Sequence, residues 1–324
     1  MSSTLFFDPA CQRPYDTGTL QQRASGGTEA SVTRIADALG AIVAQHNRTE
    51  PSGRYRPPGP VAGVEHVVLV RDARPLPVLR EQFPSARFYL WVHDQLKPGS
   101  KRGRRLRATA PLLRELGVTL ICVSDSQRRN VEATLRWLGI ADQVKAITIY
   151  NPVDDTLAPD GSAFDECKLV FFSSPNKGLA YTLDAFRALR RRIPGMTLTV
   201  GNPAYKSGRI ASSEGVEYLG ALPQARMHAE VRTALCTFAP NFVLPETFGL
   251  VFAESKALGT PVLTPDCGAA AEVLGDPRQV LPVRASCRAY ERAVHYLPPR
   301  WRRVPARLAD RLGLFDDYVE RIQS

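Results

Sequence analysis

Two glutamates, Glu246 and Glu254, enclose a glycine-containing loop and the start of an apolar helical stretch. The segment from Pro245 onward reads Pro-Glu-Thr-Phe-Gly-Leu-Val-Phe-Ala-Glu, an E-x7-E pattern. The start of a helix leaves backbone N–H groups unpaired and suits phosphate, whereas carboxylates suit the hydroxyls of a sugar or ribose. A site with both features would bind a molecule that is part phosphate and part sugar.

Glu254 falls in the mostly apolar helical stretch from Leu250 to Leu258. Burying a carboxylate there is costly unless it meets a partner, and the hydroxyl pair of a ribose would serve as one. Glutamates at this spacing also occur by chance on amphipathic helices, so the alternative is a solvated Glu254 and a simple loop charge at Glu246. The apolar surroundings favour the binding interpretation.

Short apolar runs alternate with amphipathic helices along almost the whole chain, which predicts parallel sheets with helices on both faces. The expected strands are 4–7, 65–70, 88–92, 118–123, 144–149, 168–172, 196–200, 216–219, 235–239 and 261–264. The expected helices are 126–138, 179–192, 223–234, 250–258 and one with Val32, Ile35, Ala36 and Leu39 on a single face.

A polar stretch from Asn151 to Asp165 separates two such alternating halves and is predicted to be a linker. We therefore expect an α/β fold of two doubly wound, Rossmann-like domains, residues 1–150 and 151–300, facing a central cleft. Ligands of such domains bind at the carboxyl ends of the strands. Residues 301–324 are expected to form C-terminal helices, the last over 315–322.

The composition is that of an ordinary globular protein, with 44% hydrophobic and 23% charged residues among 324. The net charge of +10 favours anionic partners without choosing among nucleic acid, lipid and phosphorylated small molecules. The six cysteines are scattered, which favours reduced thiols and a cytoplasmic location. The N-terminus lacks signal-peptide features, and no apolar run approaches the ~20 residues that span a bilayer, so membrane contact would be peripheral.

Three further positions could contribute to a ligand site. Gly26 and Gly27 open a helix, where backbone can approach an anion closely, although a simple turn explains them equally well. His93 ends a strand, as a cleft residue must, and Asp94 beside it could orient the imidazole. Lys177 lies in the loop after the strand 168–172 and could bind phosphate or remain solvated.

A basic run follows His93 and places six cations within eleven residues. The cations are Lys97, Lys101, Arg102, Arg104, Arg105 and Arg107. Few aromatic residues interleave with them, so base stacking on single-stranded nucleic acid is poorly supported. The run could bind an anionic acceptor, dock on anionic lipid at about 1 kcal/mol per cation, or be a solvated face.

The segment 245–259, followed by Thr-Pro-Val-Leu from Thr260 and Gly-Ala-Ala-Ala-Glu-Val from Gly268, resembles the donor-binding half of GT-B glycosyltransferases. It is most similar to the retaining enzymes of family 4, the E-x7-E group. The Ser-Gly-Gly-Thr-Glu segment from Ser25 and the Lys-Gly pair at Lys177 are similar to the family's diphosphate loops. The resemblance covers most of the chain.

The resemblance implies a retaining, metal-independent transfer of a sugar from a nucleotide diphosphate to a hydroxyl acceptor, which is a glycan, a lipid-linked sugar or a small molecule. Glu254 would bind the ribose, Glu246 the donor sugar, and His93 would face the reacting sugar. The diphosphate would meet backbone N–H groups near Phe248, Gly249 and Leu250, together with Gly26, Gly27 and Lys177. Residues 1–150 would then be the acceptor side and 151–300 the donor side, and the helices of 301–324 would pack back toward the first domain. We expect no metal ion and no cofactor.

One position departs from the family pattern. Relatives commonly carry an arginine five residues before the loop lysine, and Phe172 stands there in this chain. Two other enzymatic functions are compatible with a GT-B fold, namely those of a sugar-nucleotide epimerase and of a sugar-phosphate synthase. A third alternative is a non-catalytic basic protein that binds lipid or nucleic acid.

Overall fold

The computed structural model describes residues 3–202, 213–240 and 244–281. The chain divides into two compact units, with the main boundary between Pro152 and Val153. The short segment Leu20–Gly26, which includes most of α1 (Thr19–Gln22), groups with the second unit. The helices expected over 301–324 lie outside the described residues. Within those residues, no helix has the length and apolar content needed to cross a bilayer.

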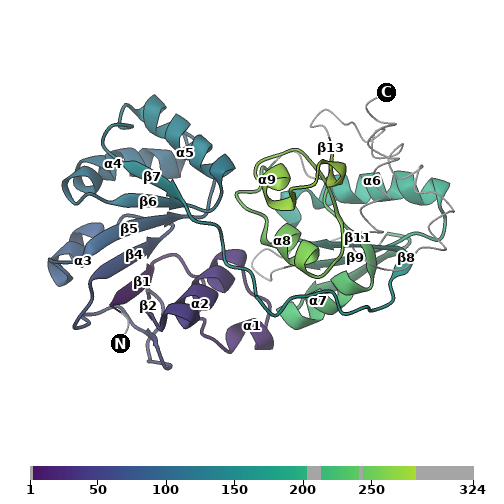
Figure 1. Cartoon of the computed structure of the whole chain (residues 1–324), viewed down its shortest axis with the longest axis horizontal. Helices are drawn as coiled ribbons and strands as arrows, with labels where there is room; N and C mark the ends of the chain where they lie inside the picture. Colours follow the sequence, from purple (N-terminus) through teal and green to yellow (C-terminus); the bar gives the residue numbers. More distant parts are fainter. Residues whose placement is uncertain (1–2, 203–212, 241–243, 282–324) are drawn as a thin grey trace. The chain divides into compact units, whose positions relative to one another are not determined.

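The first unit contains a fully parallel sheet in the order β3-β2-β1-β4-β5-β6-β7 (Figure 1). Its strands are β1 (Thr4–Asp8), β2 (Ile42–Gln45), β3 (Tyr55–Arg56), β4 (His66–Val70), β5 (Arg87–Val92), β6 (Thr119–Cys122) and β7 (Lys145–Thr148). The strand order reverses between β1 and β4. In open parallel sheets, the loops that leave such a point run in opposite directions, and ligands commonly bind there at the carboxyl ends of the strands.

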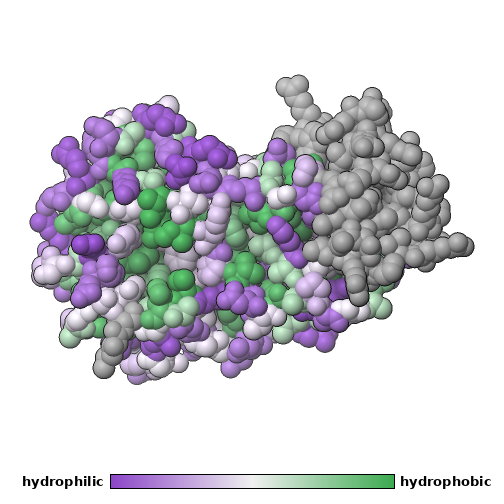
Figure 2. Space-filling view, viewed as in Figure 1, coloured by the Kyte–Doolittle hydropathy of each residue, from purple (hydrophilic) through white to green (hydrophobic). Residues whose placement is uncertain are grey.

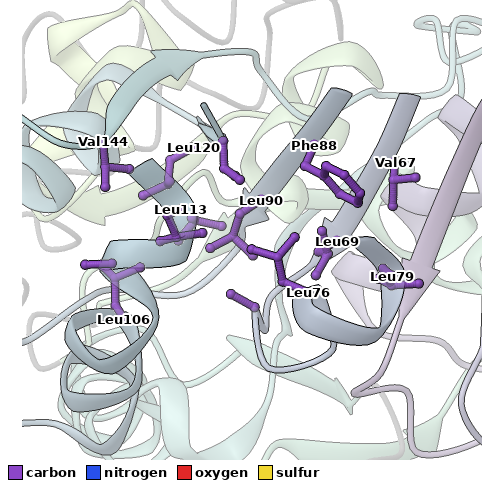
Figure 3. Close-up of a cluster of buried hydrophobic side chains, with 14 of the residues drawn as sticks. Val67, Leu69, Leu76, Leu79, Phe88, Leu90, Leu106, Leu113, Leu120 and Val144 are labelled. Carbon is purple, nitrogen blue, oxygen red and sulfur yellow. The ribbon is translucent and has the colours of Figure 1, made fainter. Parts of the chain in front are cut away.

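Four helices flank this sheet: α2 (Gly27–Leu39), α3 (Leu76–Gln82), α4 (Lys101–Glu115) and α5 (Asp125–Leu138). Apolar side chains of α3 and α4, among them Leu76 and Leu106, share one buried cluster with the strands (Figure 3). Leu135 of α5 belongs to the same cluster. Val32 and Ala36 of α2 are also buried, as their helical spacing predicts. Leu39, expected on the same face, is 50% exposed because it lies in the last turn of α2.

The second unit contains another parallel sheet, in the order β10-β9-β8-β11-β12-β13. Its strands are β8 (Asp165–Phe172), β9 (Thr197–Asn202), β10 (Val216–Ala221), β11 (Ala234–Phe238), β12 (Val262–Pro265) and β13 (Val280–Leu281). Its helices are η1 (Pro175–Lys177), α6 (Leu179–Arg192), α7 (Gln224–Arg232), α8 (Leu250–Ala257), α9 (Ala270–Leu274) and η2 (Pro277–Gln279). The order reverses between β8 and β11.

Apolar side chains of β8 point alternately to the two faces of the second sheet, which explains why helices cover both faces. Leu169 and Phe171 pack with α6, whereas Val170 and Phe172 belong to a separate cluster that includes Val231 of α7. Successive side chains of a strand point to opposite faces, so a continuous apolar strand needs a helical layer on each side. The predicted parallel sheets with helices on both faces are confirmed.

Candidate active site

A pocket lies at the reversal point of the second sheet, where β8, β11 and β12 end. Its lining combines apolar side chains with polar and charged ones. The lining residues are Phe171, Phe172, Ser173, Lys177, Thr237, Ala239, Glu246, Val251, Phe252, Thr264 and Cys267. Reversal points of open parallel sheets are the usual ligand sites of such folds, because neighbouring loops diverge there. Two residues predicted from the sequence, Lys177 and Glu246, are in this set.

Lys177 and Glu246 form an ion pair in the pocket. The ammonium Nζ lies 2.7 Å from Oε2 and 3.0 Å from Oε1 of the carboxylate. The side chain of Glu246 is only 12% exposed and that of Lys177 is 36% exposed. A partly buried carboxylate needs such a partner, because removing its hydration is costly. The two charges that were predicted to meet different parts of a ligand therefore neutralise each other in this structure.

Gly268 fixes the backbone at Glu246. The two residues form a parallel β-bridge, and the N–H of Ala269 donates to the carbonyl of Glu246 at 3.0 Å. Gly268 has a φ of +73°, and a Cβ added there would overlap the Glu246 carbonyl oxygen and lie 2.8 Å from its nitrogen. Only glycine satisfies both the left-handed backbone and this close approach.

Helix α8 begins at the pocket. Gly249 precedes it with a φ of +85°, and a Cβ at this position would lie 2.6 Å from the ring of Phe252. Phe248 is buried, whereas Leu250 starts the helix at the surface of the unit. The first-turn N–H groups of any α-helix lack intrahelical acceptors and carry the positive end of the dipole. Because Val251 and Phe252 line the pocket, this first turn is well placed for an anion.

Glu254 is buried, with 4% exposure, as its apolar helix predicted. Its Oε2 lies 3.7 Å from Nε2 of His228, a buried residue of α7. Glu254 is not among the described residues that line the pocket with Glu246. Sequence reasoning did not identify His228, and a lone histidine in an amphipathic helix gives no signal that could have identified it.

Phe172, which stands in place of the arginine, is an apolar wall of the pocket. It is 8% exposed, and its ring covers Gly201, where an added Cβ would lie 2.5 Å from the ring carbons. Among the described lining residues, Lys177 is the one with positive charge. The glycine at position 201 and the ring at position 172 are therefore complementary.

In the first unit, His93 follows β5 at the carboxyl edge of the sheet. Its ring packs 4.5 Å, centre to centre, from the Trp91 indole. Burial, reinforced by the positive charge of Arg71, lowers the pKa of His93 to about 3. We expected Asp94 to orient this imidazole. Its carboxylate forms ion pairs with Arg71 at 3.2 Å and with Arg102 at 2.9 Å.

The lowered pKa makes a prediction for His93. The folded protein keeps the ring neutral while the unfolded chain takes up a proton below about 6.5, so stability should fall as the pH drops from 6.5 toward 3. Urea unfolding at pH 7 and pH 4.5 should show a smaller loss for His93→Gln than for the wild-type protein. Ring resonances of His93 that move between pH 8 and pH 5 would contradict this assignment.

The remaining predicted positions lie in the first unit, except Gly26, which groups with the second. Gly27 is the first residue of α2, Gly26 precedes it, and the boundary between the units falls between them. Lys97, Lys101, Arg102, Arg104 and Arg107 are exposed, whereas Arg105 is half-buried and lies 3.4 Å from Asp72. Figure 2 shows mainly hydrophilic side chains at the outer surface of α4 and α5.

Backbone and capping contacts fix the loop before α4, where the basic run begins. Ser100 caps the helix by accepting from the N–H of Gly103 at 3.1 Å, and its hydroxyl donates to the carbonyl of Lys97 at 2.6 Å. A Cβ at Gly103 would clash with the carbonyls of Lys97 and Pro98. Cations in a first helical turn oppose the helix dipole, so this placement costs stability unless an anion binds nearby.

Comparison with known proteins gives one consistent result. Residues 166–297 match the sequence model of the family described as Glycosyl transferases group 1. The phosphatidyl-myo-inositol mannosyltransferase of Mycobacterium tuberculosis is 31% identical over 170 residues, which cover 48% of this chain and 42% of that protein. The chain resembles GT-B glycosyltransferases. The matched segment spans less than half of the mycobacterial relative.

Solved structures extend the GT-B likeness over the whole chain. HepE of Anabaena, crystallised with UDP and glucose, superposes with a TM-score of 0.67 at 16% identity over 99% of this chain and 97% of HepE. A sucrose-phosphate synthase from Thermosynechococcus elongatus gives a TM-score of 0.65 at 16% identity, over 99% of this chain and 94% of the other. At this identity the likeness establishes the fold alone. The GT-B fold predicted from the sequence is confirmed.

Proposed function

We propose that this protein is a retaining, metal-independent glycosyltransferase that moves a sugar from a nucleotide diphosphate to a hydroxyl acceptor. The observation that carries the proposal is the Lys177–Glu246 pair beside the start of α8, at the reversal point of the second sheet. This site falls within the segment that matches group 1 glycosyl transferases. It combines a cation, helix amides and a carboxylate, which are the groups that phosphate and sugar hydroxyls require.

In this proposal the second unit binds the donor. Lys177 and the first-turn amides of α8 stabilise the negative charge that develops on the departing diphosphate. Glu246 accepts hydrogen bonds from the donor sugar, and Glu254 does so from the ribose. In this proposal these groups bind the donor through hydrogen bonds and charge, and the rate enhancement comes from positioning and from electrostatic stabilisation of an oxocarbenium-like state.

The first unit binds the acceptor. His93, which stays neutral at physiological pH, can donate or accept one hydrogen bond at the reacting sugar. The exposed cations Lys97, Lys101, Arg104 and Arg107 would attract an anionic acceptor or the anionic surface that carries it. The mycobacterial relative is named for transfer of mannose to phosphatidyl-myo-inositol, which supports a lipid among the possible acceptors.

A thermal-shift screen against UDP, GDP, ADP and their glucose and mannose esters tests the donor. A ligand at about 100 times its Kd adds about 2.7 kcal/mol of stability, so one member of the panel should raise Tm by several degrees. Transfer to added acceptors should persist in EDTA and yield a product with the donor's anomeric configuration.

Other outcomes would contradict the proposal. Conversion of the donor sugar without an acceptor would indicate an epimerase, and transfer only to a sugar phosphate would indicate a synthase. Tight binding of nucleic acid or lipid with no response to any member of the panel would indicate a non-catalytic binding protein.

A further inference from the structure

A short hydrogen-bonded chain connects the pocket to helix α8. The hydroxyl of Thr237, in β11, lies 2.7 Å from the hydroxyl of Ser255, and the Ser255 hydroxyl lies 2.6 Å from the carbonyl of Val251. Both hydroxyl-bearing residues are buried, Thr237 with 1% and Ser255 with 0% exposure. Of the two, Thr237 lines the pocket.

The direction of these hydrogen bonds follows from the group at which they end, the backbone carbonyl of Val251. A backbone carbonyl can only accept, so the single hydroxyl proton of Ser255 points at Val251. Ser255 must then accept from Thr237, whose own proton is thereby used. The oxygen of Thr237 keeps lone-pair capacity and has no proton left to donate.

We propose that Thr237 is a specificity-determining residue that acts only as a hydrogen-bond acceptor, recognising a hydroxyl or N–H group of the ligand in this pocket. The inference rests on the proposed function, because it takes the ligand to be the nucleotide-sugar donor. Phe171, Phe172 and Phe252 line the same pocket, and a polar ligand group that met these apolar side chains without a partner would pay its desolvation cost. Analogues that lack that hydroxyl or N–H should therefore bind weakly.

Three variants separate recognition from simple structural support. Thr237→Val and Ser255→Ala both remove the hydrogen bond between these two side chains, so each should lower Tm. Only Thr237→Val also removes the acceptor from the pocket. Its affinity for the donor should fall about tenfold, the loss of roughly 1.4 kcal/mol that one hydrogen bond supplies. Ser255→Ala and Thr237→Ser, which keep an oxygen at position 237, should bind within about twofold of wild type.

Titration calorimetry with UDP-glucose and GDP-mannose, then with deoxy analogues of the tighter ligand, provides the measurement. The analogue that lacks the recognised group should lose about tenfold on the wild-type protein and almost nothing further on Thr237→Val, since interacting groups are non-additive. Wild-type affinity in Thr237→Val, or an equal loss in Ser255→Ala, would overturn the role of Thr237 while leaving the proposed function intact. Absence of nucleotide-sugar binding by the wild-type protein would overturn both.

Discussion

Replacing Glu246 with alanine should lower the rate of sugar transfer about 100-fold while the protein remains folded. Hydrogen bonds to a charged group contribute about 1.5–3 kcal/mol, and those from donor hydroxyls to this carboxylate would be lost. The fold should tolerate the change because the remaining partner, Lys177, is 36% exposed and can be hydrated. Initial rates with the donor found in the screen, together with Tm, measure both parts of the prediction.

Two further variants make the result interpretable. Glu217→Ala removes an exposed carboxylate from β10 of the same unit and should leave the rate unchanged. Lys177→Met also breaks the ion pair, but it removes the cation that is proposed to bind phosphate. It should therefore weaken binding of the free nucleoside diphosphate, whereas Glu246→Ala should leave that binding at least as strong. Transfer at the wild-type rate in Glu246→Ala would refute the role assigned to this carboxylate.

Gly268→Ala should abolish donor binding and destabilise the second unit by about 2 kcal/mol or more. A left-handed φ costs an alanine about 1–2 kcal/mol, and the added Cβ would overlap the backbone of Glu246. Relief requires the Glu246 segment to move, which breaks its bridge to Gly268 and displaces the carboxylate from Lys177. Tm and titration with the donor would record the two effects.

Gly161→Ala is the matched control for this substitution. Gly161 has a φ of +75°, close to the +73° of Gly268, but nothing lies within 4 Å of an added Cβ. It should therefore show the backbone cost alone, with donor affinity preserved. Equal behaviour of the two variants would mean that the contact between Gly268 and Glu246 has no part in building the pocket.

Periodicity in the sequence predicted most of the fold. The helix expected over 179–192 is α6, because each buried face leaves a helical spacing of apolar residues. The same periodicity did not predict β2 (Ile42–Gln45). This strand begins three residues after Leu39, the end of α2, and its apolar run is too short to distinguish from a continued helix. The periodicity placed the start of β8 at Lys168, whereas the strand begins at Asp165, within the expected linker.

The sequence identified several residues of the candidate site but not the contacts that their side chains make. Lys177 and Glu246 are 69 residues apart, and nothing local in either segment shows that their side chains meet. Phe172 was visible as a departure from the arginine pattern, but its packing against Gly201 depends on the pairing of β8 with β9. Thr237 was overlooked because one threonine in an apolar strand is unremarkable until Ser255 is seen opposite it.

The ion pair between Lys177 and Glu246 also favours ligands that carry phosphate and hydroxyl groups in the same molecule. Inorganic phosphate that captured Lys177 would leave a carboxylate of 12% exposure without its counter-charge, and a free sugar at Glu246 would have to compete with the ammonium for the same oxygens. A ligand that carries both phosphate and hydroxyls separates Lys177 from Glu246 but gives each of them a new partner, phosphate for the ammonium and hydroxyls for the carboxylate. We therefore expect a ligand that carries hydroxyls and phosphate in one molecule to bind far better than the two groups supplied separately.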